Sequence, residues 1–306
     1  MSPSNSSKAD APILITGGGG QLARALDAAA RAAGLAATRV GRPEFDFDRP
    51  DSLDAVMRDR APSLVVNAAA YTAVDAAETD EAAAYRANRD GPARLATLAA
   101  AAGVPIVHVS TDFVFDGSKG SPYSETDPTS PLGVYGASKL AGERAVLSSG
   151  ARAIVLRTSW VYAPEGKNFV LTMLNAARRT DRLRVVADQR GCPTRASDLA
   201  EGIVAIVARL RRTGWRDEHG GIFHAAGAGW TTWHGFAEAI FANAARHGVA
   251  APVVEPIATA DWPTPTRRPA DSRLDCTKLA ATFGVRLPDW QASLSRTIDE
   301  ILGGRA

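Results

Sequence analysis

The stretch ILITGGGGQLA, residues 13–23, places four consecutive glycines between an apolar run and a segment rich in leucine and alanine. The apolar run predicts a buried strand, and the segment that follows predicts a helix. Glycines at such a turn let the backbone approach a pyrophosphate, whose charge is met by N–H groups and the positive end of the helix. A flexible glycine linker is the alternative, but a linker has no reason to follow a strand and open a helix. The spacing Gly17, Gly20, Ala23 therefore favours a dinucleotide-binding turn.

Short apolar runs alternate with helical patterns through the first half of the chain, which is typical of βαβ units. Each run is nearly all apolar, as expected for strands that helices cover on both faces. The sequence therefore predicts an α/β protein with a Rossmann-type, doubly wound parallel sheet. The expected strands are residues 12–16, 35–40, 63–69, 105–111 and 153–160.

The pattern becomes less regular after residue 160, which indicates a second unit. We expect a disordered tail at 1–11, an NAD(P)-binding Rossmann domain at 12–160 and a smaller, partly interleaved substrate-binding domain in most of 161–306. Two apolar runs, 183–188 and 221–227, are the segments that could return to the main sheet. The proline-rich stretch 252–269 is expected to be a long loop.

Composition excludes several classes of protein. Hydrophobic residues make up 45% of the 306 residues, the formal net charge is +2, and no lysine-rich run suggests a nucleic-acid footprint. No run of eighteen apolar residues and no apolar signal segment occurs, so we expect no membrane partner and a cytoplasmic location. Cys192 and Cys276 stand alone, without metal-ligand spacing, so neither a disulfide nor a metal site is expected.

The end of the second expected strand indicates which nicotinamide cofactor is preferred. It contains Arg39, Gly41 and Arg42, with no carboxylate for a ribose 2′-hydroxyl and two guanidinium groups for a 2′-phosphate. We therefore expect NADPH, with Arg42 as the favoured contact and Arg39 as the second, and NADH as the alternative. Two solvated arginines at a strand end are the other interpretation of the same residues.

Three side chains have the chemistry for proton transfer to a carbonyl oxygen. Thr111 lies at the carboxyl end of an expected strand, where open α/β sheets bind ligands. Tyr135 and Lys139 follow in YGASK, and a separation of four on a helix places both on one face. An ammonium about 6 Å away at an effective dielectric of 20 contributes about 2.8 kcal/mol, which would lower the phenol pKa by roughly two units. The sequence thus predicts a tyrosine general acid; a surface Tyr–Lys pair is the alternative.

Further motifs extend nearly through the chain from residue 12. They are TGGGGQLA, VVNAAAYTAVDAAE, VSTDFVFDG, ETDPTSPLGVYGASKLAGE, RTSWVYAPEGKNF, DQRGCPT, TTWHGFA and TPTRRPADSRLD. Together they resemble the dTDP-4-dehydrorhamnose reductase family of the extended short-chain dehydrogenase/reductase superfamily. The resemblance implies reduction of the C4 ketone of dTDP-4-dehydro-L-rhamnose to dTDP-L-rhamnose, an activated sugar for surface polysaccharide such as lipopolysaccharide.

The resemblance also implies roles for residues. Tyr135 would protonate the C4 oxygen, Lys139 would hold the nicotinamide ribose and Thr111 would hydrogen-bond the carbonyl. The expected substrate contacts are Thr111, Asp112, Trp160, Arg268 and Arg273. The expected cofactor contacts are Gly17, Gly20, Gln21, Leu22, Arg42, Asp46, Phe47, Ala70, Tyr71, Thr72, Tyr135 and Lys139.

The sequence departs from the family pattern in two places. Some relatives carry a carboxylate in the first helix that shares a magnesium ion between subunits, but residues 23–26 carry none, so a monomer or weak homodimer is expected. The acidic residue of the second strand is replaced by Gly41, which agrees with NADPH. Two other functions stay open: a nucleotide-sugar epimerase or dehydratase of the same superfamily, and a non-catalytic dinucleotide-binding regulatory subunit.

Overall fold

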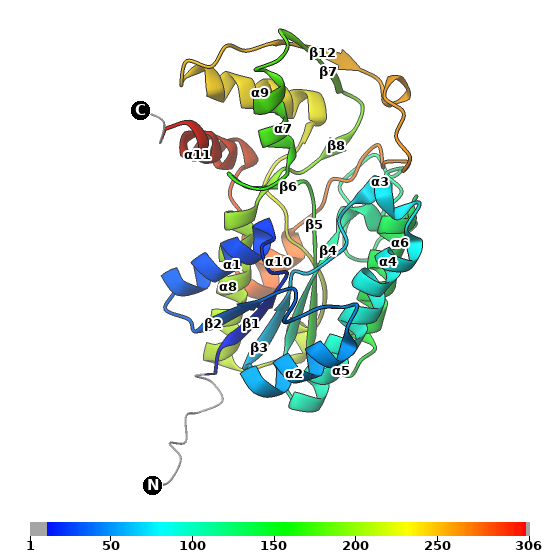
Figure 1. Cartoon of the computed structure of the whole chain (residues 1–306), viewed down its shortest axis with the longest axis vertical. Coiled ribbons are helices and arrows are strands. Elements are labelled where there is room, and N and C mark those ends of the chain that lie inside the picture. The colour runs from blue at the N-terminus through cyan, green and yellow to red at the C-terminus, as the bar shows by residue number, and fades with distance from the viewer. Residues whose placement is uncertain (1–10, 304–306) are drawn as a thin grey trace.

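A parallel sheet forms the centre of the main lobe (Figure 1). In the computed structural model, which describes residues 11–303, six strands pair in the order β10-β5-β4-β3-β1-β2, each parallel to its neighbours. The expected tail at 1–11 lies outside the described residues except for Ala11. The strands are β1 (Ile13–Thr16), β2 (Ala37–Val40), β3 (Leu64–Asn67), β4 (Ile106–Thr111), β5 (Ala153–Thr158) and β10 (Gly221–His224). The Rossmann-type parallel sheet predicted from the sequence is confirmed.

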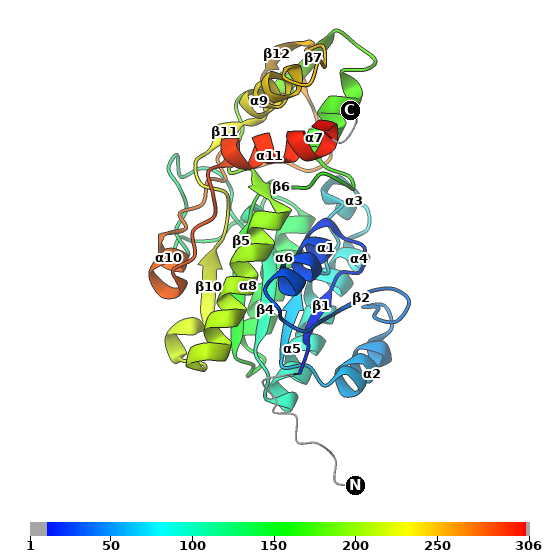
Figure 2. The same ribbon diagram turned by 90° about the vertical axis from the view of Figure 1, so that its left-hand side faces the viewer.

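Two layers of helices cover the two faces of this sheet, and alternating strand residues pack against each layer (Figures 1 and 2). Ile13 and Ile15 belong to the core beneath one layer, whereas Leu14 belongs to the core beneath the other. The first layer is α1 (Gln21–Ala32), α8 (Ala196–Thr213) and α10 (Thr277–Phe283). The second is α2 (Pro50–Arg60), α5 (Gly91–Ala102) and α6 (Val134–Leu147). Burial of both faces explains why the strand sequences are almost entirely apolar.

Other segments of the second half of the chain build a smaller lobe over the carboxyl ends of the strands (Figure 1). Its core is rich in aromatic residues, including Tyr162, Phe236 and Trp290. Its helices are α7 (Phe169–Ala176), α9 (Trp233–Ala245) and α11 (Trp290–Leu302). Its short strands are β6 (Val161–Tyr162), β7 (Arg182–Val186), β8 (Arg190–Gly191), β9 (Thr194–Arg195), β11 (Thr231–Thr232) and β12 (Val253–Ile257).

Short helices complete the chain. They are α3 (Val74–Ala77), α4 (Glu81–Tyr85), the π-helical turn η1 (Arg86–Asp90), and the 3₁₀ turns η2 (Asp112–Val114), η3 (Asp217–His219) and η4 (Thr259–Asp261). The π-helical turn lies where the sequence pattern indicates one continuous helix from 80 to 102. It directs Asn88 into the protein interior, where that side chain is fully buried.

Of the two runs that could return to the main sheet, one does so and the other does not. The run 221–227 provides β10, which returns to the edge of the main sheet beside β5. The run 183–188 does not return: β7 pairs with β12 in a separate two-stranded sheet. Strand β12 itself lies inside 252–269, where a long loop was expected, and that expectation is wrong. The two strands lie about 70 residues apart in the chain, so local sequence pattern does not show that they pair.

Candidate active site

The carboxyl ends of the parallel strands open into a cleft of about 860 Å³. Its lining includes the glycine turn 17–20, residues 68–72 after β3, residues 109–113 at the end of β4, and residues 158–161 at the end of β5. Strand order reverses around β1, whose neighbours are β2 and β3. Open α/β sheets bind ligands at such a switch point. The cleft therefore lies where the sequence analysis predicts a dinucleotide.

The glycine turn needs residues without a Cβ atom. Gly17 and Gly18 have φ angles of +107° and +51°, which favour glycine. A Cβ added to Gly41 at the end of β2 would lie 2.4 Å from the Cα of Gly18, so the two backbones are in direct contact. Helix α1 then begins at Gln21 with Gly20 as its N-cap. This shallow backbone cradle ahead of a helix N-terminus suits a pyrophosphate.

The Gln21 side chain is engaged with the smaller lobe. Its Nε2 donates to the carbonyl of Lys167 at 3.2 Å, and its Oε1 accepts from Asn168 at 2.8 Å. The predicted cofactor residues Gly17, Gly20, Gln21 and Leu22 all line the cleft.

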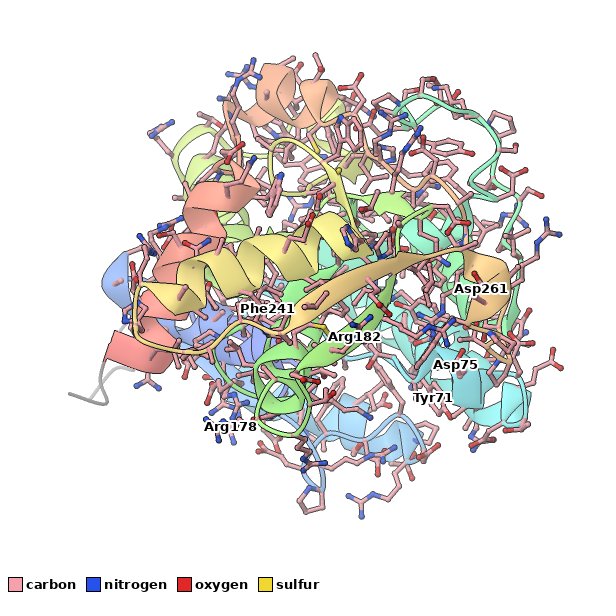
Figure 3. All side chains as sticks on the ribbon, turned by 90° about the horizontal axis from the view of Figure 1, so that it is seen from above. Tyr71, Asp75, Arg178, Arg182, Phe241 and Asp261 are labelled. Atoms are coloured by element: carbon pink, nitrogen blue, oxygen red, sulfur yellow. The ribbon has the colours of Figure 1, made fainter. Side chains whose placement is uncertain are left out.

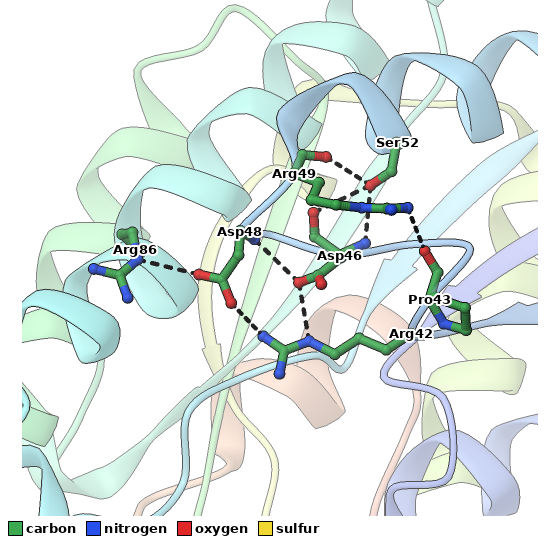
Figure 4. Close-up of polar contacts among 7 residues, drawn as sticks. All are labelled: Arg42, Pro43, Asp46, Asp48, Arg49, Ser52 and Arg86. Atoms are coloured by element: carbon green, nitrogen blue, oxygen red, sulfur yellow. Dashed lines mark hydrogen bonds and ion pairs between the residues drawn. The ribbon is translucent and has the colours of Figure 1, made fainter.

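Arg42 lies at the rim of the cleft and is already paired with two carboxylates (Figure 4). Its Nε donates to Asp46 at 2.9 Å and its Nη2 to Asp48 at 2.6 Å, while 68% of its side chain stays exposed. Asp48 also accepts from Arg86 at 3.1 Å. Arg39, the second expected contact, donates to the carbonyl of Gly18 at 2.5 Å and does not line the cleft. Of these two arginines, only Arg42 lines the cleft.

The remaining predicted cofactor residues also line the cleft: Asp46, Phe47, Ala70, Tyr71 and Thr72. Phe47 packs against the start of α5, where a Cβ on Gly91 would lie 2.2 Å from its ring. The Tyr71 backbone is fixed by Asn88, whose Oδ1 accepts its N–H at 2.8 Å and whose Nδ2 donates to its carbonyl at 3.1 Å. Sequence analysis missed Asn88, because its role depends on the π-helical turn that points it inward.

Tyr135 and Lys139 lie on α6 and both line the cleft. They are buried, with 9% and 2% of their surface exposed, respectively. The Lys139 ammonium donates to the carbonyl of Val109 at 2.7 Å, and the Tyr135 ring packs edge-to-face against Phe113. Thr111, the last residue of β4, is 5% exposed and lies beside the phenol. The three residues predicted to carry the chemistry are therefore brought together in one cleft.

Burial controls the pKa values of this pair. The pKa of Tyr135 is raised to about 12 because burial penalises the phenolate and the negative Asp112 adds to this, although a hydrogen bond with Thr111 opposes it. The pKa of Lys139 is lowered to about 8 because burial penalises the ammonium, which the charge of Glu143 partly offsets. The expected depression of the tyrosine pKa by Lys139 is therefore wrong for this arrangement. The ammonium is bound to a backbone carbonyl and both groups are desolvated.

A buried ion pair lies one helical turn beyond Lys139. Glu143 accepts from Arg157 through both carboxylate oxygens, at 2.9 and 2.7 Å, and from the Ser110 hydroxyl at 2.5 Å. Glu143 and Arg157 are only 1% and 2% exposed. The pair ties α6 to the last residues of β4 and β5, the strand ends that form the cleft.

Asp112 follows Thr111 and is almost fully buried. Its pKa is raised to about 6 because burial penalises the carboxylate, although hydrogen bonds from Ser272 and Thr111 partly offset this. Among residues 11–303, its Oδ2 finds no hydrogen-bond partner within bonding distance. A buried, cleft-lining oxygen without a partner is suited to accept a hydrogen bond from a ligand hydroxyl.

Trp160 follows β5 with a φ of +45°, which is unusual for a residue with a side chain. Its indole stacks on Trp233 with ring centroids 3.5 Å apart and planes 8° apart. A Cβ on Gly191 would lie 2.3 Å from the same indole, so glycine is needed there. Trp233, which sequence analysis missed as an individual site residue, also lines the cleft.

The two arginines expected to bind substrate are placed differently. Arg268 lines the cleft, and its Nη2 donates to Asp75 at 2.9 Å. Asp75 lies on α3 and is marked with Tyr71 in the view down onto the smaller lobe (Figure 3). Arg273 is held by Asp271 through two hydrogen bonds, of 2.8 and 2.6 Å, and is not among the residues that line the cleft. A neighbouring carboxylate thus holds Arg273 outside the cleft lining, and its contact with substrate stays a prediction.

Residues 11–303 contain neither a metal-binding cluster nor a helix that could span a membrane. That part of the chain holds no group of three or more His, Cys, Asp or Glu side chains arranged to bind a metal ion. Within the same residues, no helix combines the length and the apolar character needed to cross a membrane.

The parallel sheet, glycine turn and buried Thr–Tyr–Lys cleft together define a dinucleotide-binding oxidoreductase of the short-chain type. The chain belongs to the dTDP-4-dehydrorhamnose reductase family of NAD(P)H-dependent oxidoreductases: the family model described as the RmlD substrate binding domain matches residues 11–302. The family expected from the sequence motifs is confirmed.

Individual relatives agree with this membership. The chain is 46% identical over 290 residues to a dTDP-4-dehydrorhamnose reductase of Sinorhizobium fredii, covering 95% of this chain and 97% of the relative. The solved dTDP-4-dehydrorhamnose reductase of Clostridium acetobutylicum is similar with a TM-score of 0.87 and 34% identity, covering 95% of this chain and 99% of the other. The dTDP-4-dehydrorhamnose reductase of Bacillus anthracis, solved in complex with NADP, is similar with a TM-score of 0.86 and 30% identity. The match covers 94% of this chain and 99% of the other.

Proposed function

We propose that this protein reduces the C4 ketone of dTDP-4-dehydro-L-rhamnose with NADPH and releases dTDP-L-rhamnose. The observation that carries the proposal is the convergence of Thr111, Tyr135 and Lys139 on the cleft that the glycine turn enters. Family membership supports the same reaction. The product would supply surface polysaccharide synthesis, and a cytoplasmic location follows from the use of NADPH.

Bound NADPH would supply the hydride that reduces the ketone carbon. The Tyr135 hydroxyl then gives its proton to the ketone oxygen, and Thr111 donates a hydrogen bond to that oxygen. With a pKa of about 12, Tyr135 is fully protonated at neutral pH, as a proton donor must be. Lys139 would hold the nicotinamide ribose with the two N–H groups of its ammonium that do not bind the Val109 carbonyl.

The residues around the cleft fit both ligands. The glycine turn 17–20 lines the cleft directly ahead of the N-terminus of α1, where backbone N–H groups would meet a pyrophosphate, and Arg42 would meet the 2′-phosphate of NADPH. Asp112 would accept a sugar hydroxyl through its unpartnered Oδ2, beside Trp160 and Arg268. We assign cofactor binding to the main lobe and closure over the sugar to the smaller lobe.

The experiment supplies purified protein with dTDP-4-dehydro-L-rhamnose and either NADPH or NADH, follows the loss of nicotinamide absorbance and identifies the sugar by NMR. We expect one NADPH oxidised per dTDP-L-rhamnose formed. A sugar that is epimerised or dehydrated without net NADPH oxidation would indicate the epimerase or dehydratase alternative. Tight NADPH binding with no turnover on any dTDP-4-keto sugar would indicate the regulatory subunit.

A further inference from the structure

An exposed tryptophan lies near two guanidinium groups outside the cleft lining. Trp230 is 48% exposed, a large fraction for its size. The guanidinium carbon of Arg273 lies 4.7 Å from its ring centroid, and that of Arg190 lies 5.7 Å away. None of the three residues is among those that line the cleft. We call these residues, Arg190, Trp230 and Arg273, the indole–guanidinium cluster.

Backbone bonds hold the cluster beside the substrate end of the cleft. Arg190 donates its N–H to Ala270 at 2.8 Å and accepts from the N–H of Ser272 at 2.9 Å. It pairs with Thr232 across the β8–β11 ladder. The next residue, Gly191, packs directly against Trp160. Arg190 therefore directly precedes the residue that contacts the Trp160 indole, which lines the cleft. The Arg190 backbone, and not its side chain, makes the hydrogen bonds to Ala270, Ser272 and Thr232.

The Ser272 hydroxyl connects the cluster with Asp112, to which we assign a sugar hydroxyl. Ser272 donates a hydrogen bond to the Arg190 carbonyl at 3.3 Å, and it also lowers the pKa of Asp112. Asp112 adjoins Thr111 at the reacting end of the cleft. Ser272 and Gly191 therefore place the cluster next to Asp112 and Trp160, two residues that line the cleft.

The two arginines of the cluster differ in whether a carboxylate compensates their charge. Arg273 is neutralised by Asp271, which is 4% exposed and binds it through both oxygens. Within the described part of the chain, no carboxylate lies within ion-pairing distance of the exposed Arg190 guanidinium. The cluster thus offers one uncompensated cation beside an aromatic face. A guanidinium matches phosphate oxygens bidentately, and an exposed indole face stacks on a nucleobase.

We propose that Arg190 and Trp230 bind the nucleoside diphosphate portion of the substrate, Arg190 at the diphosphate and Trp230 at the pyrimidine ring. The proposal rests on the proposed function only in taking a dTDP-sugar as substrate. It concerns nucleotide binding and needs no hydride transfer, so it can be tested without turnover.

The test measures dTDP binding by calorimetry for wild type, Arg190→Ala, Arg190→Lys and Trp230→Ala. We expect the dissociation constant for dTDP to rise roughly 5- to 100-fold in each alanine variant, as for loss of base stacking or of a phosphate contact. Arg190→Lys keeps the charge but not the planar fork, so its dissociation constant for dTDP should lie between those of wild type and Arg190→Ala. The Arg190→Ala effect should shrink in 0.5 M salt because it is electrostatic, whereas the Trp230→Ala effect should persist.

Matched controls come from elsewhere on the surface. Trp262→Ala removes another exposed tryptophan, 55% exposed, and Arg178→Ala removes an exposed arginine beyond α7 that is marked in Figure 3. Both should bind dTDP as wild type does. All variants should keep the wild-type melting temperature and affinity for NADPH, because the altered side chains make none of the β8 backbone bonds.

Unchanged dTDP affinity in Arg190→Ala and Trp230→Ala overturns the proposal, as does equal weakening in the control variants. With dTDP-4-dehydro-L-rhamnose, we expect KM to rise about tenfold in the same two variants while kcat stays within about twofold. If dTDP binds in a Trp230-dependent manner but no sugar is reduced, the nucleotide site stands and the proposed reaction fails.

Discussion

The Lys139 ammonium is bound to the backbone carbonyl of Val109, with Nζ 2.7 Å from the oxygen. The charge is therefore held against strand β4 rather than on the phenol of Tyr135, its neighbour on α6. Because both side chains are buried, desolvation moves the two pKa values in opposite directions, to about 12 for Tyr135 and about 8 for Lys139. The site thus holds a protonated phenol and an ammonium that loses its charge near pH 8.

Replacing Tyr135→Phe should lower kcat about 10²- to 10⁴-fold, because the proton donor is lost while the ring and its packing remain. The affinity for NADPH should change little. Tyr85→Phe, which lies outside the cleft lining, should keep wild-type turnover. Single-turnover oxidation of NADPH measures the effect, and a loss of less than fivefold would mean that another group donates the proton.

The activity should fall with pH above about 8. In the proposed reaction the Lys139 ammonium is the form that would bind the ribose. Its pKa is lowered to about 8, so the charged fraction declines as the pH passes that value. Lys139→Arg should start from a lower rate but keep a flat profile to about pH 9.5, because arginine stays charged. The profile of kcat/KM for NADPH provides the measurement. An identical alkaline decline in both proteins would assign it to another group.

Asp112→Asn should stabilise the protein at neutral pH. The Asp112 pKa is about 6 when folded and 3.8 in the reference state, so the folded state binds more protons between these values and the free energy of unfolding falls as pH rises through them. The full difference corresponds to about 3 kcal/mol above pH 6. We expect a gain of about 1–3 kcal/mol at pH 7 that disappears near pH 4.

Urea unfolding of Asp112→Asn at several pH values gives this comparison. Asp59→Asn, at a carboxylate that is 63% exposed, should show no such pH-dependent gain. Equal stability of wild type and Asp112→Asn at pH 7 would show that hydrogen bonds to the carboxylate fully compensate its burial.

Changes at Arg42 and Asp48 should move cofactor preference in opposite directions. Arg42→Ala should lower the ratio of kcat/KM for NADPH to that for NADH about tenfold, by loss of the phosphate contact. Asp48→Asn should raise the same ratio, because the carboxylate 2.6 Å from Arg42 no longer competes with the phosphate. Steady-state rates with both cofactors give the ratio. The same direction of change in both variants would contradict an Arg42 contact.

Gly41→Ala should destabilise the protein by about 1–3 kcal/mol, because the added Cβ would lie 2.4 Å from the backbone of Gly18. Gly19→Ala is the matched control, since a Cβ there meets nothing within 4 Å. Urea unfolding compares the two. Equal free energies of unfolding for Gly41→Ala and Gly19→Ala would show that the glycine turn can move without loss of stability. For the same reason, Gly41→Asp should not convert the enzyme to NADH use, although it restores an acidic residue at the end of β2.

The sequence by itself determined the parallel sheet, the glycine turn and the three residues, Thr111, Tyr135 and Lys139, that share the cleft. Strand periodicity is local, and Tyr135 and Lys139 are four residues apart on one helix, so short-range pattern is sufficient to predict them. It also identified Arg42, because a residue at a strand end is placed by the strand itself.

Only the tertiary structure decided which charged side chains form ion pairs. Arg273 is held by Asp271 and Arg42 is shared by two carboxylates; no periodicity indicates these pairings. Asn88 and Trp233 enter the site from segments far along the chain, through a π-helical turn and an aromatic stack. The direction of the Tyr135 pKa shift depended on burial, which distant elements create together. Sequence pattern specifies local geometry, whereas desolvation and charge compensation arise only when remote side chains are packed against one another.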